Sequence, residues 1–220
     1  MPDLYRAAVK QSLSDLLEQA DALVDARLSE IAVKHLAGQH DQVTHGHGGG
    51  GREQTIKKVE DEMSRMSYTD NERAVIVARD GGVILDKHGG ENEVEFSAQE
   101  VDKMRGATLT HNHPNGASFS ETDIDFAGVA DLSEVRVVGV GNKYTYSMTR
   151  TSTNKPWPSK NDVRESYRDA EGPHYNRIMT SFFAGGISKE DARAELSHST
   201  WADIVKDPSM NLTYMRTARP

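Results

Sequence analysis

The sequence predicts an α/β fold in which helices flank a sheet, with a long helix before that domain and a mainly helical tail after it. Three observations predict this arrangement. From residue 68 onward, short runs rich in β-branched and aromatic residues alternate with segments of helical periodicity. Residues 3–36 contain no glycine or proline, whereas residues 38–51 contain six glycines. These changes in composition divide the chain into four predicted segments: 1–37, 38–67, 68–150 and 151–220.

The first segment, residues 1–37, is predicted to form one long amphipathic helix. Its apolar residues recur at helical spacing, as in the series Leu13, Leu16, Leu17 and Ala20. An isolated helix of this length cannot bury its apolar stripe by itself. We therefore expect it to pack against a second copy of the chain or against another protein; the alternative is that it folds back on its own domain.

The second segment, residues 38–67, is predicted to be a Gly/His-rich linker followed by a short helix. Three histidines, His40, His45 and His47, lie in the glycine-rich part and could chelate a metal ion. A glycine-rich segment holds no fixed geometry, however, and this favours a flexible connector.

The third segment, residues 68–150, begins with a predicted hairpin. Residues 74–79 and 83–87 are apolar-rich strands around an Asp-Gly-Gly turn, and residues 94–96 are a further short strand. A helix is expected to start after Ser97, because a glutamate three residues later completes a capping-box pattern.

The remaining elements follow from the same signals. We expect a strand, then a helix, then two strands around a Gly-Asn turn, at 107–113, 120–132, 134–140 and 143–148. In the tail, a helix is predicted to start at Ser188, and a last strand is predicted near residues 211–217. Four residues of the tail are expected to belong to a core or an interface: Trp157, His174, His198 and Trp201.

The strand at 107–113 carries the candidate metal site. Side chains alternate between the two faces of a strand, so His111 and His113 project from the same face and can converge on one ion. A Pro-Asn-Gly turn follows, and Asp123 lies in the first turn of the next helix, where it could supply a third ligand. Two imidazoles and one carboxylate form a familiar zinc set that leaves a fourth position for water. The chain has no cysteine, which excludes thiolate sites.

Hydrolysis by such a site needs two further groups. Glu72, at the start of the first predicted strand, is the best candidate for the general base. The hydroxyl of Ser120 is placed to stabilise an oxyanion, provided that it is not used in capping the helix. Ser-x-x-Asp caps a helix whether or not a metal is present, so Ser120 and Asp123 alone indicate little.

These residues together resemble the JAMM (MPN-type) zinc metalloprotease family, since His-x-His-Pro precedes Ser-x-x-Asp and a glutamate lies upstream. The resemblance covers roughly residues 68–150, and THNHPNG is closer to the RadC-like and phage-encoded branch than to the eukaryotic deubiquitinase branch, where His-Ser-His-Pro is usual. It implies a mixed sheet flanked by helices, His111, His113 and Asp123 as zinc ligands, Glu72 as general acid/base and Ser120 as the oxyanion-stabilising residue.

The sequence departs from the family pattern at one place. Six residues separate His113 from Ser120, whereas the family usually has seven, so Ser118 or Glu121 could take a role assigned to a neighbour. The segment GQHDQVTHGHGGGG resembles linkers of phage minor head proteins.

Two functions follow as expectations. The first is a zinc-dependent hydrolase that cleaves a peptide or isopeptide bond, acting within a phage head or similar assembly. The alternative is a structural minor head or assembly protein with a JAMM-like domain whose catalysis is absent or incidental. Expected partners are a peptide substrate and, through residues 1–37, phage head or portal proteins or a second copy of the chain.

Composition weighs against other classes of function. The net charge of −8 argues against general nucleic-acid binding. It also argues against a DNA-repair role, which the RadC resemblance would otherwise suggest. The N-terminus lacks a signal peptide and no window is long and apolar enough for a membrane span, so a cytoplasmic or virion location is expected.

Overall fold

A computed structural model describes residues 51–67, 70–90, 93–141 and 143–219 of the chain. The helix predicted over residues 1–37 and the linker histidines His40, His45 and His47 lie outside these residues. The predictions for them therefore stay predictions.

The described residues form a mixed sheet flanked by helices, which confirms the predicted α/β class. Six strands pair in the order β2-β1-β3-β4-β5-β6. Only β3 and β4 are parallel neighbours, and the other four pairs are antiparallel. The strands are β1 (Arg73–Val77), β2 (Val83–His88), β3 (Thr108–His113), β4 (Glu134–Gly139), β5 (Tyr144–Arg150) and β6 (Leu212–Ala218).

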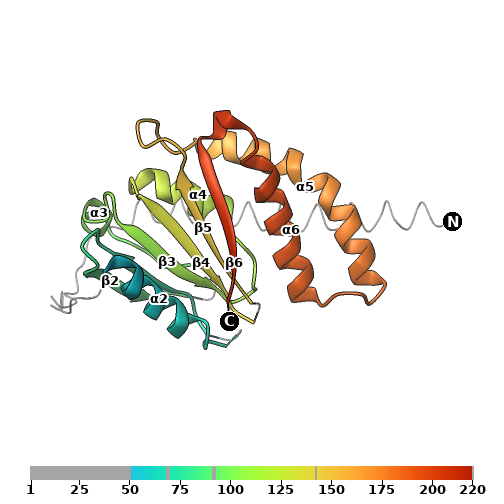
Figure 1. Cartoon of the computed structure of the whole chain (residues 1–220), viewed down its shortest axis with the longest axis horizontal. Helices are drawn as coiled ribbons and strands as arrows, with labels where there is room; N and C mark the ends of the chain where they lie inside the picture. The colour runs from blue at the N-terminus through green and yellow to red at the C-terminus, as the bar shows by residue number, and fades with distance from the viewer. Residues whose placement is uncertain (1–50, 68–69, 91–92, 142, 220) are drawn as a thin grey trace. The chain divides into compact units, whose positions relative to one another are not determined.

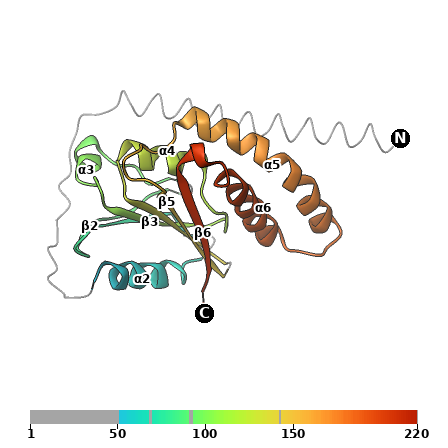
Figure 2. The same ribbon diagram turned by 45° about the horizontal axis from the view of Figure 1, so that its top comes forward.

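Helices cover both faces of this sheet. Figure 2 shows α2 on one face and α4, α5 and α6 on the other. In Figure 1 the last strand, β6, runs beside α6 at the edge of the sheet. The helices are α2 (Arg52–Met63), α3 (Ala98–Asp102), α4 (Glu121–Val129), α5 (Lys160–Phe183) and α6 (Lys189–Ile204), with a short 3-10 helix at Pro208–Met210.

Side chains alternate between the two faces of each strand, so the sheet has one hydrophobic core on each face. On one face, α2 packs its buried apolar side chains against Val75, Val77 and Val138. On the other face, strand residues such as Ile76 and Val137 pack under the remaining helices. The buried Trp157 and Trp201 belong to this larger core, as the sequence predicted.

The predicted strand at residues 94–96 is wrong. This segment has no strand pairing and no regular secondary structure. The ring of Phe96 stacks on Phe126 of α4, with 5.3 Å between the ring centroids. Contact with the helical layer thus replaces the edge pairing that the apolar pattern suggested.

Segments outside residues 68–150 complete the sheet and its layers. The predicted last strand is confirmed as β6, which pairs with the whole of β5, from Tyr144 opposite Ala218 to Arg150 opposite Leu212. The short helix expected before residue 68 is α2, which buries one face of the sheet.

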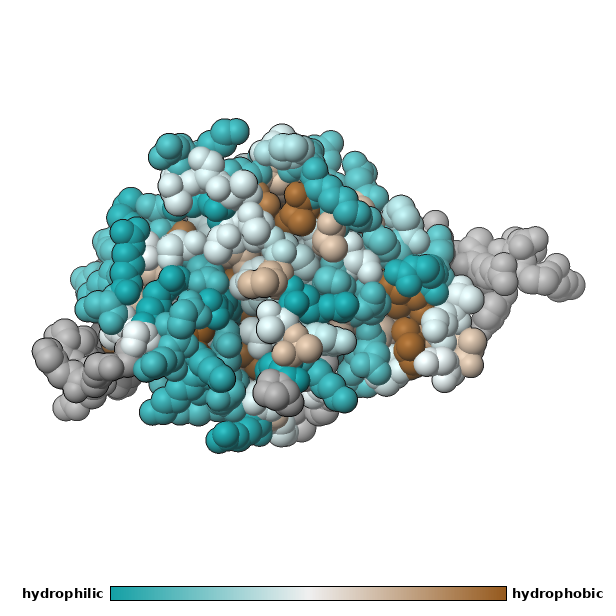
Figure 3. Space-filling view, viewed as in Figure 1, coloured by the Kyte–Doolittle hydropathy of each residue, from teal (hydrophilic) through white to brown (hydrophobic). Residues whose placement is uncertain are grey.

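The surface in Figure 3 is mostly hydrophilic, with apolar residues in small separate groups. Among the described helices, none has both the length and the apolar character that crossing a membrane would require. Large apolar side chains that stand exposed are few and dispersed among the described residues: Val83, Val129, Phe183 and Met215.

Candidate metal centre

The two histidines lie on a central, fully buried strand. β3 pairs with β1 on one side and with β4 on the other, and all six of its residues are buried. His111 stands opposite Ala74 of β1 and Val137 of β4, on the face that carries the larger core. Since side chains two residues apart share a face, His113 projects from the same face as His111.

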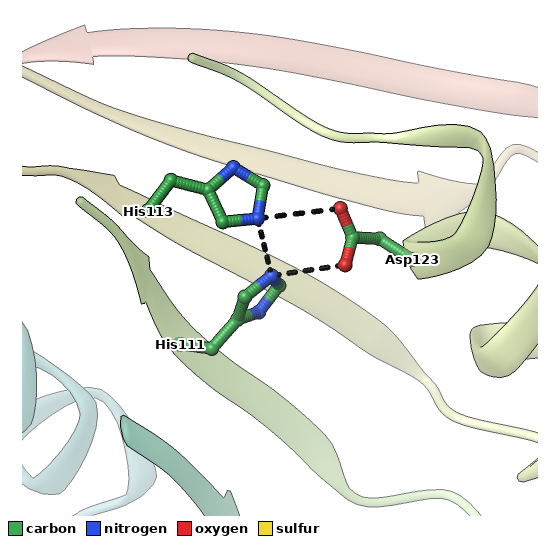
Figure 4. Close-up of side chains that lie close together, drawn as sticks. All are labelled: His111, His113 and Asp123. Carbon is green, nitrogen blue, oxygen red and sulfur yellow. Dashed lines mark hydrogen bonds and ion pairs between the residues drawn. The ribbon is translucent and has the colours of Figure 1, made fainter. Parts of the chain in front are cut away.

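Asp123 of α4 meets both imidazoles, as Figure 4 shows. The Nε2 atoms of His111 and His113 are 3.1 Å apart. One carboxylate oxygen of Asp123 is 3.1 Å from Nε2 of His111, and the other is 3.5 Å from Nε2 of His113. The three residues offer ligand atoms that all lie within 4.8 Å of one another.

This geometry fits a shared metal ion. Two nitrogens bound to zinc at roughly 2.0–2.1 Å in a tetrahedral site would be about 3.3 Å apart. The observed separation of 3.1 Å is close to that value. Because two nitrogens and a carboxylate suit zinc and other first-row divalent ions, His111, His113 and Asp123 are residues that could hold such an ion.

The start of α4 places Asp123. After β3 the chain turns sharply, with Gly116 at a positive φ of 77°, and its N–H donates to the carbonyl of His113 at 3.0 Å. Ser120 is the N-cap of α4, and its N–H and hydroxyl both donate to Oδ2 of Asp123, at 2.6 Å and 2.8 Å. The capping box therefore fixes the carboxylate that faces the histidines.

The environment keeps Asp123 ionised. Burial disfavours a charged carboxylate, but interactions with His111 and His113 and the hydrogen bond from the Ser120 backbone outweigh burial and hold the pKa of Asp123 well below its ordinary value. A carboxylate that keeps its charge at a buried position is a suitable ligand for a cation.

Glu72 lies at the edge of the same group. It immediately precedes β1, and its N–H donates to Gly90 O at 2.9 Å. In the register that pairs Ala74 with His111, a residue two positions before Ala74 falls on the same face, level with His113. Burial, supported by the negative charge of Asp123, raises the pKa of Glu72 to about 7, although His113 opposes the shift.

Ser120, predicted to stabilise an oxyanion, and its alternatives Ser118 and Glu121 each have another partner in the structure. The hydroxyl of Ser120 is used in the helix cap, and its predicted oxyanion role depended on that hydroxyl being free of the cap. Ser118 is 1% exposed, and its hydroxyl is 3.2 Å from the hydroxyl of Tyr214. Glu121 forms an ion pair with Arg164 at 3.3 Å.

The sequence did not predict the residues that hold the Nδ1 side of the His113 ring. Its Nδ1 is 2.9 Å from the carbonyl of Ser118, and Ser118 in turn contacts Ser197 and Tyr214. Tyr214 belongs to a predicted strand, but no sequence pattern connects Ser197 or Tyr214 with a histidine about 80–100 residues earlier.

Comparison of the chain with family models, with curated proteins and with solved structures gives no match. The fold and the site therefore rest on the structure itself: a mixed six-stranded sheet with helices and a buried His–His–Asp group.

Proposed function

We propose that this chain is a metal-dependent hydrolase, a zinc peptidase or isopeptidase of the JAMM type. The observation that carries the proposal is the convergence of His111, His113 and Asp123 on one point, with ligand atoms within 4.8 Å of one another. Glu72, with its raised pKa, lies close enough to interact electrostatically with two of the three. Perturbed ionisable groups gathered around one site are typical of catalytic centres.

Each residue has a role in this proposal. The two imidazoles and the carboxylate would hold the ion and leave a fourth position for water. A bound zinc ion lowers the pKa of its water to about 7, which makes hydroxide available near neutral pH. The carboxylate of Glu72 would accept the proton of the attacking water and pass it to the leaving amine.

In the structure, the hydroxyl of Ser120 contacts a candidate metal ligand instead of standing free for an oxyanion. Its hydroxyl donates to Asp123 at 2.8 Å, so it orients a metal ligand. Its single proton serves that bond, and an oxyanion role would require the hydroxyl to leave the cap. Orientation of Asp123 is the role that the hydrogen bonds support.

Zinc content tests the ligand assignment. We expect about one zinc ion per chain in the purified protein and none in a His111→Ala/His113→Ala double variant. A His88→Ala/His174→Ala double variant is the control, because neither histidine belongs to the His–His–Asp group. The proposal fails if the native protein binds no more zinc than the double variant that lacks His111 and His113.

Two glutamate variants test the base. Glu72→Gln should keep its zinc and lose peptide hydrolysis, because an amide cannot accept the proton. Glu121→Gln should keep both, since Glu121 pairs with Arg164. If the Glu121 variant loses activity and the Glu72 variant keeps it, the roles assigned to the two glutamates are wrong.

The assembly role is a proposal from the sequence pattern alone. An amphipathic helix over residues 1–37 would dock the hydrolase to a phage head or portal protein, or to a second copy of the chain. Cross-linking through lysines substituted on the polar side of residues 10–30 would identify the neighbour. Absence of any cross-linked partner at assembly concentrations would remove this part of the proposal.

A further inference from the structure

The ring of His113 is held from the side that faces away from Asp123. Its Nδ1 is 2.9 Å from the carbonyl oxygen of Ser118 and 3.3 Å from that of Ala117. Both neighbours are acceptors, so Nδ1 must carry the proton, which leaves the lone pair on Nε2 for the metal position. Among the described residues, Nδ1 of the buried His111 has no such partner. Orientation by an outside residue is therefore specific to His113.

Two elements from the end of the chain fix Ser118. Its N–H donates to Oγ of Ser197 in α6 at 2.9 Å, a contact between residues 79 positions apart. Its hydroxyl is 3.2 Å from the hydroxyl of Tyr214 in β6, which is also 3.0 Å from Nδ1 of His198 in α6. The backbone and the side chain of Ser118 are thus both bonded to the C-terminal segment.

Packing reinforces these hydrogen bonds. The buried indole of Trp201 in α6 donates from Nε1 to the carbonyl of Phe119 at 2.8 Å. The ring of Tyr214 meets Phe119 edge-on and stacks on Tyr146, with centroids 6.2 Å and 6.3 Å apart. The loop between β3 and α4 therefore has little freedom to move independently of α6 and β6.

We propose that α6 and β6 set the position and the protonated nitrogen of His113 through Ser118, so that Ser197 and Tyr214 are positioning residues of the metal centre. Partners that orient a ligand in this way usually change metal affinity by about 10–100-fold when they are removed. The inference rests on the proposed function only in taking His113 as a metal ligand. On this proposal the C-terminal segment, which lies outside residues 68–150, helps to position a metal ligand.

Zinc affinity of three variants of the full chain is the first test. Ser197→Ala removes the acceptor for the Ser118 N–H, and Tyr214→Phe removes one hydroxyl but keeps the ring. Both should bind zinc about 10-fold or more weakly than the native protein, measured by competition with a chromophoric chelator. Ser199→Ala is the matched control, because Ser199 is a buried serine of the same helix whose hydroxyl bonds to Glu195. It should bind zinc as the native protein does.

Nitrogen NMR of the metal-free protein is the second test. Two-bond ¹H–¹⁵N correlation in histidine-labelled protein should show His113 in the Nδ1–H form, and both variants should show a mixture of tautomers. The signal is assigned by its loss in a His113→Gln variant. A native protein that binds no zinc would refute the proposed function, while the tautomer measurement would still decide this inference. Native affinity and an unchanged tautomer in both variants, or an equal loss in Ser199→Ala, would overturn it.

Discussion

Replacement of Ser120 by alanine separates two contributions of the same residue. Its Oγ accepts from the N–H of Asp123 at 3.2 Å and donates to Oδ2 of Asp123 at 2.8 Å. Ser159, the N-cap of α5, makes the same pair of bonds to Asp162, at 3.3 Å and 2.6 Å. Both serines are exposed, and only Asp123 faces the two histidines. Ser159→Ala is therefore a matched control for the helix cap.

The expected magnitudes follow from these contacts. Loss of a serine N-cap costs about 1 kcal/mol, within a range of roughly 0.5–2 kcal/mol. For a chain of 220 residues, each 1 kcal/mol lowers the melting temperature by about 2–4 °C, so both variants should melt a few degrees lower. Ser120→Ala should also weaken zinc binding by about 10-fold, which is the lower end of the roughly 10–100-fold loss seen when a residue that orients a metal ligand is removed. The lower end applies because the Ser120 N–H, at 2.6 Å, still holds the carboxylate.

Calorimetric melting of the metal-free variants and zinc competition of the same samples provide the two measurements. The two variants should lose equal stability but unequal zinc affinity. An orienting role for Ser120 would be refuted if Ser159→Ala lost as much affinity as Ser120→Ala, or if Ser120→Ala kept native affinity while losing the stability of its cap.

Three further predictions concern the metal, the core and pH. With free zinc at about 100 times its dissociation constant, removing the zinc with a chelator should lower the free energy of unfolding by about 2.7 kcal/mol. Calorimetry should then show a melting temperature roughly 5–11 °C lower. Trp201→Phe leaves the carbonyl of Phe119 without its donor, which should cost about 1–3 kcal/mol in denaturant unfolding, and an unchanged midpoint would contradict this. In the metal-free protein the pKa of Glu72 is raised from 4.5 to about 7, so the folded chain keeps a proton that the unfolded chain releases. Stability should therefore fall as pH rises between these two values, and the fall should be smaller in Glu72→Gln when unfolding midpoints are compared across that range.

Local signals predicted most of the elements and their starts. Ser97, Ser120 and Ser188 were each predicted to begin a helix, and each side chain accepts from the backbone N–H three residues later. Such bonds depend only on neighbours in the sequence, so a residue pattern is enough to predict them. The face shared by His111 and His113 was predictable for the same reason, because the period of a strand is a local property.

The remaining features depend on contacts between distant segments. Residues 94–96 have the composition of a strand, but they lie outside the sheet, and Phe96 stacks on Phe126 of α4. The bond from Ser118 to Ser197 joins two ordinary serines 79 positions apart, and neither has a sequence signal. A single sequence carries no information about such pairs, whereas the fold brings them together.

The position of β3, more than the motif at the start of α4, gives the site its chemistry. Ser-x-x-Asp starts α4, α5 and α6 alike, and only the first of these places its carboxylate beside two imidazoles. The imidazole side chains of His111 and His113 are 6% and 10% exposed, and Nδ1 of His111 is buried with no partner among the described residues. Burial of polar groups without full hydrogen bonding is unfavourable and needs a compensating interaction. Coordination of one cation by both Nε2 atoms and by Asp123 is an interaction that their geometry allows, and it would offset that cost at the centre of the sheet.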